Sequence, residues 1–156
     1  YETKYERLKL MYPSDFTLKV VESTGSTVSP GMDTITITSP SGVIVDIHAG
    51  IAGIGGACPD YTVASSVPIG ILGKQAYLNY VNNGSAINTV VLASGKEEAC
   101  IGGLIGKNVM QVPASYGPAS ILATITQRDY SGTSLADFQK NPDVQQGVFI
   151  IKSFSY

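Results

Sequence analysis

Residues 34–48 read TITITSPSGVIVDIH, and this stretch decides the fold. In Thr34–Thr38 isoleucines alternate with threonines, the period of a strand with one apolar and one polar face. Ser39–Gly42 has the composition of a tight turn, and Val43–His48 is a second run rich in β-branched residues. The stretch therefore predicts an antiparallel hairpin, and the rest of the chain has to supply its neighbours.

Further strand patterns lie on both sides of this hairpin. On the N-terminal side, Leu8–Met11 and Phe16–Val21 flank the turn-forming sequence Tyr12–Asp15, which predicts a second hairpin. On the C-terminal side three more strands are expected, at Gly73–Val81, Ile87–Leu92 and Ser120–Thr126. The Asn-Asn-Gly of residues 82–84 suits a turn between the first two of these. Residues 49–68 show no sustained period and predict an irregular crossover, and one antiparallel sheet is expected.

Only the C-terminus predicts helix. Ser134 is a candidate N-cap for a short turn, and Asn141 with Pro142 restarts the helix, because Pro is tolerated at the first helical position. Apolar residues then follow at helical spacing: Val144, Val148 and Ile151. Gly147 weakens this helix by about 1 kcal/mol relative to Ala, so the helix has to pack on the sheet. Residues 1–156 are expected to form a single α+β domain, an antiparallel sheet covered by helices that include the C-terminal one.

Composition and charge exclude several classes of partner. Of the 156 residues 44% are hydrophobic and 14% are charged, with a net charge of −2. The basic residues are scattered, which argues against nucleic acid and anionic membrane surfaces. Direct membrane insertion is not expected, because no run approaches the roughly 20 apolar residues of a spanning helix. The start, Tyr1–Tyr5, does not resemble a signal peptide, so we expect any export signal or anchor to lie outside this sequence.

Both cysteines lie beside glycine-rich turns. Cys58 follows Gly55-Gly56, and Cys100 precedes Gly102-Gly103. Such loops gain order from a cross-link, so a Cys58–Cys100 disulfide is predicted. Two buried free thiols are the alternative, and a metal-binding or catalytic role ranks behind both. With a surface rich in Ser, Thr, Asn and Gly, the disulfide favours an extracytoplasmic location, secreted or tethered to the cell surface.

The sequence contains little that predicts catalysis. His48, the single histidine, shares a strand face with Asp46, but there is no Gly-x-Ser-x-Gly elbow to supply a serine. A pair of polar residues on a solvated face is the favoured interpretation. One His without a carboxylate at i+3 or i+4, and without Cys-x-x-Cys, predicts no metal site. Gly50–Gly56 lacks the Gly-Lys-Ser/Thr end of a phosphate-binding loop, so no cofactor is expected.

Two segments near the ends of the chain resemble a known family. Leu10–Phe16, LMYPSDF, resembles the F-x-Y-P-S-D-W opening of PsbP-like domains, and Val148–Phe154, VFIIKSF, is similar to their I-L-x-S-F-K-F ending. Residues 34–40 match a strand that often follows the first hairpin, and a turn like Gly53–Cys58 recurs in such bacterial proteins. Phe16 stands where Trp is usual, and the chain has no Trp. The resemblance implies an α/β/α sandwich on an antiparallel sheet of about six strands. It implies little about activity, and no family binding residues carry over.

These observations favour a non-catalytic extracytoplasmic module of the cell envelope, with a binding or structural role. Its expected partner is another envelope or surface protein, and its oligomeric state is left open. The alternative is a subunit of a larger surface assembly, such as a filament or layer, and a remote alternative is a hydrolase using His48. Nine tyrosines raise the further hypothesis of a binding face with amphipathic rings, drawn from Tyr61, Tyr77, Tyr80, Tyr116 and Tyr130.

Overall fold

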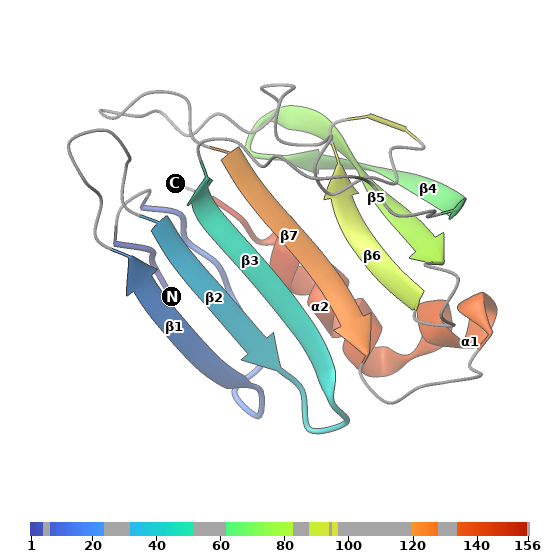
Figure 1. Cartoon of the computed structure of the whole chain (residues 1–156), viewed down its shortest axis with the longest axis horizontal. Helices are drawn as coiled ribbons and strands as arrows, with labels where there is room; N and C mark the ends of the chain where they lie inside the picture. Colours follow the sequence, from blue (N-terminus) through green and yellow to red (C-terminus); the bar gives the residue numbers. More distant parts are fainter. Residues whose placement is uncertain are drawn as a thin grey trace.

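The computed structural model describes residues 1–4, 7–23, 32–51, 62–82, 88–93, 95–96, 120–127 and 134–155. Within these ranges the chain forms a seven-stranded antiparallel sheet and two short C-terminal helices (Figure 1). The elements are β1 (Thr17–Ser23), β2 (Met32–Thr38), β3 (Val43–Ile51), β4 (Thr62–Ile71), β5 (Lys74–Asn82), β6 (Asn88–Ala93), β7 (Ser120–Gln127), α1 (Leu135–Lys140) and α2 (Pro142–Lys152).

The strand order is β1-β2-β3-β7-β6-β5-β4, and every neighbouring pair is antiparallel. The sheet thus consists of two meanders, β1–β3 and β4–β6, with the last strand in sequence, β7, between them (Figure 1). β1 and β4 form the two edges. The fold class α+β is confirmed, with seven strands where about six were expected.

The hairpin predicted at residues 34–48 is confirmed. Thr38 pairs with Ile44 and Thr36 with Asp46, and the turn is closed by a bond from Ser39 N to Val43 O of 2.8 Å. Gly42 has a φ of 84°, the left-handed conformation for which glycine is suited. The alternation also has the expected result, because Ile35 and Ile37 are fully buried while the threonines between them are half-buried.

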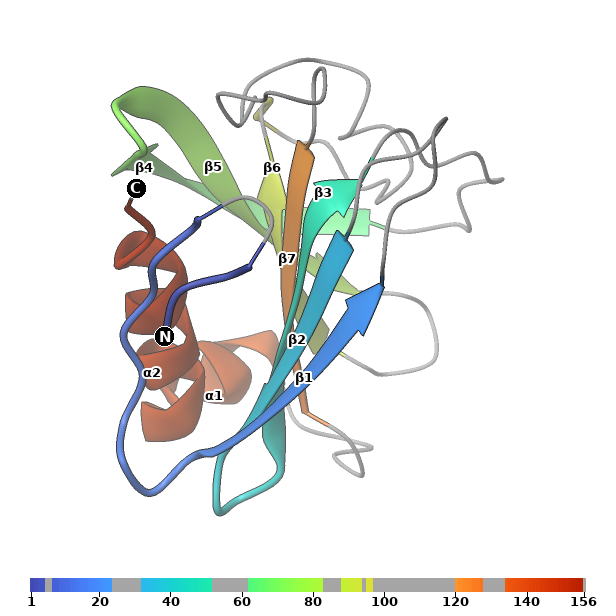
Figure 2. The ribbon, with the colours of Figure 1, turned by 90° about the vertical axis from the view of Figure 1, so that its left-hand side faces the viewer.

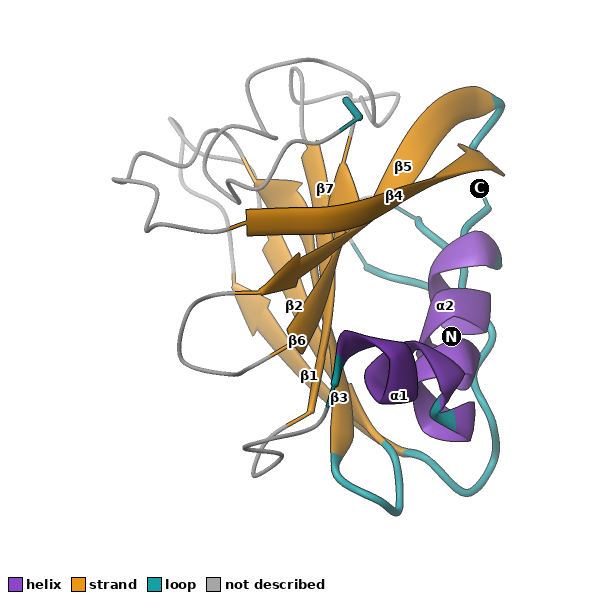
Figure 3. Ribbon diagram, turned by 90° about the vertical axis from the view of Figure 1, so that its right-hand side faces the viewer, coloured by secondary structure: helices purple, strands orange, loops and turns teal. Residues whose placement is uncertain are grey.

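Both predicted helices and their caps are confirmed. The Ser134 hydroxyl accepts a bond from Asp137 N, and Asn141 Oδ1 accepts one from Asp143 N at 2.9 Å, with Pro142 at the first position of α2. The predicted apolar stripe is buried on the sheet, together with Ile150 and the C-terminal Phe154: Val144, Val148, Ile150, Ile151 and Phe154. Figures 2 and 3 show both helices on the same side of the sheet.

Gly147 marks a close approach of α2 to the sheet. A Cβ built on Gly147 would lie 3.1 Å from Ile125 Cδ1, Ile125 Cγ2 and Val45 Cγ2. Central strands β3 and β7 supply these two side chains. The glycine therefore weakens the isolated helix but allows the helix axis to lie close to the centre of the sheet.

The hairpin predicted at the N-terminus is wrong in its first strand. Leu8–Met11 does not pair with β1, and the Lys9 backbone instead bonds to Ser155, with Lys9 N to Ser155 O at 2.8 Å and Ser155 N to Lys9 O at 3.0 Å. This segment lies beside α2, on the helix side of the sheet (Figure 2). Leu8 and Leu10 are buried there, so the alternation was real but did not identify the neighbouring segment.

Part of the predicted crossover at residues 49–68 is also wrong. β3 continues to Ile51, and β4 begins at Thr62, which adds an edge strand to the sheet. The register of β4 shifts at Ala64, between the pairs Val63–Val81 and Ser65–Tyr80, and Pro68 interrupts its apolar pattern. A bulge and a proline are both typical of edge strands. Here they interrupt the alternation of apolar and polar residues by which a strand is recognised in a sequence.

Candidate functional site

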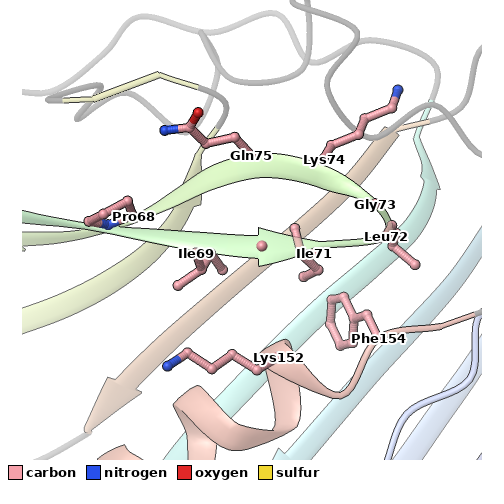
Figure 4. Close-up of a pocket in the computed structure, with 10 residues that line it drawn as sticks. Pro68, Ile69, Ile71, Leu72, Gly73, Lys74, Gln75, Lys152 and Phe154 are labelled. Carbon is pink, nitrogen blue, oxygen red and sulfur yellow. The ribbon is translucent and has the colours of Figure 1, made fainter.

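A concavity lies where the tip of the β4–β5 hairpin passes over the C-terminal end of α2 (Figure 4). This hollow has a volume of about 600 Å³ and is open to solvent. Its lining comes from the hairpin, residues 68–75, and from Lys152 and Phe154 at the end of the chain. The hollow therefore joins two segments that lie far apart in the sequence.

The hairpin tip is held in place by its turn and by the core. Ile71 pairs with Lys74 across the two turn residues Leu72 and Gly73, whose φ angles are 50° and 73°. Positive φ at both central residues is the requirement of a type I′ turn, which keeps the two strands closely twisted together. Gly73 accepts this conformation freely, whereas Leu72 is strained in it.

The wall of the hollow that faces α2 is apolar. Ile69, Ile71 and Phe154 are 7%, 3% and 5% exposed and belong to the main core of the protein. Figure 4 shows Phe154 beneath Ile71 and Leu72, so its ring lies across the gap from the hairpin. These side chains are ordered by the core, and a ligand in the hollow would contact the small part of each that remains exposed together with the half-buried Leu72.

One cation lies at the side of this apolar surface. The Lys152 side chain extends beneath Ile69, toward the Pro68 side of the hollow, whereas Lys74 points away from the helix (Figure 4). Within the described residues the Lys152 ammonium forms no ion pair, and it is exposed. Lys152 also lies in the last turn of α2, where a positive charge is favoured by the helix dipole.

The described lining of the hollow supplies groups that can contact a ligand. Among its described lining residues there is no carboxylate, imidazole, thiol or hydroxyl side chain. The lining thus offers apolar contact, an ammonium group and the backbone of an edge strand. Such a combination suits a ligand that carries a negative group next to an apolar part.

The opposite side of the sheet presents a second kind of surface, which we call the outer face. The register places Lys19, Thr36, Asp46 and Thr124 in one row across β1, β2, β3 and β7. Five further threonines point to the same side: Thr17, Thr34, Thr38, Thr89 and Thr126. The outer face is therefore rich in hydroxyl groups over β1, β2, β3 and β7, whereas over β5 and β6 it carries a second buried apolar cluster of Val81, Val91 and Ala93.

His48 and Asp46 share the outer face, as predicted, but each bonds to a threonine. Thr36 Oγ1 donates to Asp46 Oδ1 at 2.8 Å, and Thr34 Oγ1 lies 3.3 Å from His48 Nδ1. Both threonines come from the neighbouring strand β2. Cross-strand hydroxyl bonds of this kind stabilise a sheet, so both side chains have a structural role.

Replacing His48 with Ala is expected to lower the free energy of unfolding by no more than about 1 kcal/mol, because only one long, half-exposed hydrogen bond is lost. Urea denaturation measures this change. Ligand binding at the hollow, on the other side of the sheet, should stay within twofold of the parent value, where twofold is about 0.4 kcal/mol. A hydrolytic activity that disappears in His48→Ala would instead establish the hydrolase alternative.

The remaining predicted site residues fall into two groups. Cys58 and Cys100 lie outside the described residues, so their disulfide stays a prediction, and Tyr61, Tyr116 and Tyr130 lie outside them too. Tyr80 is buried in the core, where burial raises the pKa of its hydroxyl, and Tyr77 is half-buried on the outer face. Because Tyr77 and Tyr80 lie on opposite faces of the sheet, these two rings do not form one binding face.

A polar notch at the beginning of the helices has a structural explanation. The Ser41 hydroxyl donates to Asp143, which lowers the pKa of that carboxyl, and Asn141 Nδ2 donates to Gln127 Oε1 at 3.2 Å. These bonds connect the β2–β3 turn and β7 to the first turn of α2. The polar groups of the notch therefore hydrogen-bond to one another, and these bonds hold the start of α2 against the sheet.

Sequence reasoning did not identify the hollow. Its walls come from the β4–β5 hairpin, whose residues 69–72 fall between the predicted crossover and the predicted strand, and from Lys152 and Phe154 at the end of the chain. The available signal was Leu72-Gly73 between two apolar runs, which is compatible with a two-residue hairpin turn. Nothing in the sequence indicates that this turn lies against residues 152–154.

No helix in the described ranges is long and apolar enough to cross a membrane. Comparison of the chain with protein-family models, with curated proteins and with solved structures finds no match.

Proposed function

We propose that this chain is a non-catalytic binding module of the cell envelope, and that its ligand site is the hollow between the β4–β5 hairpin and the end of α2. The observation that carries the proposal is an ordered apolar wall beside a lysine without an ion pair in the described structure. The ligand class is an anion with an apolar part. Apolar contact with the half-buried Leu72 and with the small exposed parts of Ile71 and Phe154 contributes affinity, and the Lys152 ammonium selects the negative group.

An extracytoplasmic location is part of the proposal. Its support is the surface composition and the predicted Cys58–Cys100 disulfide, which belongs to oxidising compartments. A PsbP-like domain is proposed on the opening and closing sequence motifs, and α1 and α2 form one helical layer of its α/β/α architecture (Figures 2 and 3). In support, the two motifs lie side by side: Met11 N donates to Ser153 Oγ at 2.9 Å, next to the backbone pairing of Lys9 with Ser155. An envelope or surface protein is the proposed partner.

The fluorescent anion anilinonaphthalene sulfonate tests the ligand class, because it joins a negative group to apolar rings. The folded chain is expected to bind it saturably, and Lys152→Gln should weaken binding by about five- to tenfold, the usual size of one charge-assisted contact. Lys140→Gln is the matched control, since Lys140 is also an exposed lysine in the last turn of a helix, α1. It should leave binding unchanged.

Leu72→Asn separates binding from folding. Asn tolerates the positive φ of position 72 better than Leu, so the variant should fold at least as well while losing apolar contact in the hollow. Weaker dye binding by Leu72→Asn, with an unchanged unfolding midpoint, supports the hollow as the site. Equal binding by parent, Lys152→Gln and Leu72→Asn, or no saturable binding at all, contradicts the proposed function.

A second candidate function is a subunit of a surface assembly, and the outer face favours it. Threonines with Lys19 and Asp46 form a hydroxyl-rich surface over β1, β2 and β3 that suits polar contact with a second protein. Light scattering distinguishes the two candidates. A monomer at high protein concentration counts against assembly, whereas ordered association that is lost when Thr36 is replaced by Arg favours it.

A further inference from the structure

We propose that the ligand of the hollow is the C-terminal end of an extended peptide chain, which pairs with the outer edge of β4 and places its terminal carboxylate at Lys152. This inference rests on the proposed function, because it assigns a ligand to the same hollow. It adds a backbone recognition mode that a free lipid-like anion cannot use.

The edge of β4 offers backbone groups at the hollow. β4 is the last strand of the sheet order, so its second edge carries no strand within the described residues. The residues that flank a two-residue turn form a hydrogen-bonded pair, and such pairs alternate with non-bonded ones along a hairpin. The pair Ile71–Lys74 therefore bonds inward, and the pair Gly70–Gln75 leaves the N–H and C=O of Gly70 directed outward.

Gly70 leaves room for an incoming chain. The glycine is exposed, and no heavy atom lies within 4 Å of the position that a Cβ would occupy. Two residues earlier, Pro68 occupies the next outward-facing position, where it has no N–H to donate. The accessible ladder is therefore short, and it suits the end of a chain rather than its middle.

Lys152 fixes the direction of the peptide. Its ammonium lies on the Pro68 side of the hollow, while Phe154 lies beneath the hairpin tip (Figure 4). A carboxylate at Lys152 requires the peptide to run from Leu72 toward Pro68, which is antiparallel to β4. The peptide then ends where Pro68 ends the ladder, so charge and backbone pairing specify the same register.

This register assigns the last three residues of the ligand. The penultimate residue lies opposite Gly70 and exchanges two backbone hydrogen bonds with it, with its side chain toward the outer face. The last residue lies opposite Ile69 and the third from the end lies opposite Ile71, so both side chains point into the hollow. The ligand class is thus a C-terminus with apolar residues at its last and third-last positions.

The test uses the peptide Ser-Thr-Val-Ala-Leu as a free acid, as its C-terminal amide and with an N-methyl group on Ala, titrated against the full chain. The acid is expected to bind and to shift and protect the Gly70 amide in NMR and hydrogen exchange. Amidation and N-methylation should each weaken binding about tenfold or more, because each removes one anchoring interaction. Lys152→Gln should bind acid and amide equally, whereas Lys140→Gln should still prefer the acid.

Laurate is the competing ligand, since it offers a carboxylate on an apolar chain without a peptide backbone. Laurate and anilinonaphthalene sulfonate binding without peptide binding overturns this inference and leaves the proposed function in place. Acid and N-methyl peptides of equal affinity also overturn it, because strand pairing would then contribute nothing. If the acid peptide, laurate and anilinonaphthalene sulfonate all fail to bind, both the inference and the proposed function are overturned.

Discussion

A chain that ends at Pro142 is expected to give no soluble, cooperatively folding monomer. Truncation removes five buried side chains from the core: Val144, Val148, Ile150, Ile151 and Phe154. Burial of each contributes roughly 1.5–3 kcal/mol, so their sum is comparable to the roughly 5–15 kcal/mol that separates folded from unfolded small proteins. The exposed apolar side of β3 and β7 should also promote aggregation. Sedimentation and far-ultraviolet circular dichroism of the purified product check this result.

A single substitution tests the same contact within the full chain. Val148→Asp places a carboxylate in the core, at a cost of roughly 3–5 kcal/mol, the usual size for an uncompensated buried charge. Gln146→Asp is the matched control, because position 146 is in the same helix and exposed. It should change the unfolding midpoint only slightly. A folded monomer after truncation, or equal midpoints for the two Asp variants, would show that the sheet does not need α2 and that the fold is all-β.

Gly147→Leu is expected to destabilise the fold almost as strongly. The Cβ alone would already lie 3.1 Å from atoms of Ile125 and Val45, and the rest of the leucine would have to displace the sheet. Overpacking costs typically 1–3 kcal/mol and more where the backbone cannot move, which outweighs the gain of about 1 kcal/mol in helix propensity. Urea denaturation of Gly147→Leu beside Gln146→Leu isolates the packing effect, since position 146 faces solvent.

A smaller pair of substitutions identifies the contact itself. Gly147→Ala adds only the Cβ, and Ile125→Val removes the Cδ1 atom that the Cβ would meet. The double variant should be more stable than the sum of the two single changes by about 0.5 kcal/mol or more, because the cavity of one accepts the methyl group of the other. Strict additivity would mean that helix and sheet do not meet at Gly147.

Local signals explain which parts of the fold could be predicted. The hairpin at residues 34–48 has a clean period of two and a turn with glycine in place, and the helix caps at Ser134 and Asn141 act within three residues of chain. β4 could not be predicted, because Ala64 at a bulge and Pro68 at an edge interrupt its period. The pattern of Leu8–Met11 identified buried side chains but not the C-terminal segment that pairs with Lys9.

The candidate site could not be predicted either, because it depends on contact between segments that are far apart in the sequence. Ile71 and Lys152 belong to different local structures, and they line one hollow only because β4 forms the edge of the sheet above the end of α2. His48 and Asp46, by contrast, were predicted to share a face because two residues on one strand always do. Proximity within an element could be predicted from the sequence, and proximity between elements could not.

The central position of β7 determines when the sheet can be completed. In the part of the chain that the structure describes, the meanders β1–β3 and β4–β6 pair with each other only through this strand. Until residues 120–127 are available, β3 and β6 are unprotected edges of two separate three-stranded sheets, and neither has the α2 cover. Folding therefore depends on contacts of long sequence separation, which slow the search for the native state. Because the strand that joins the two halves is also the last strand in sequence order, neither half can be closed into the full sheet before that segment is in place.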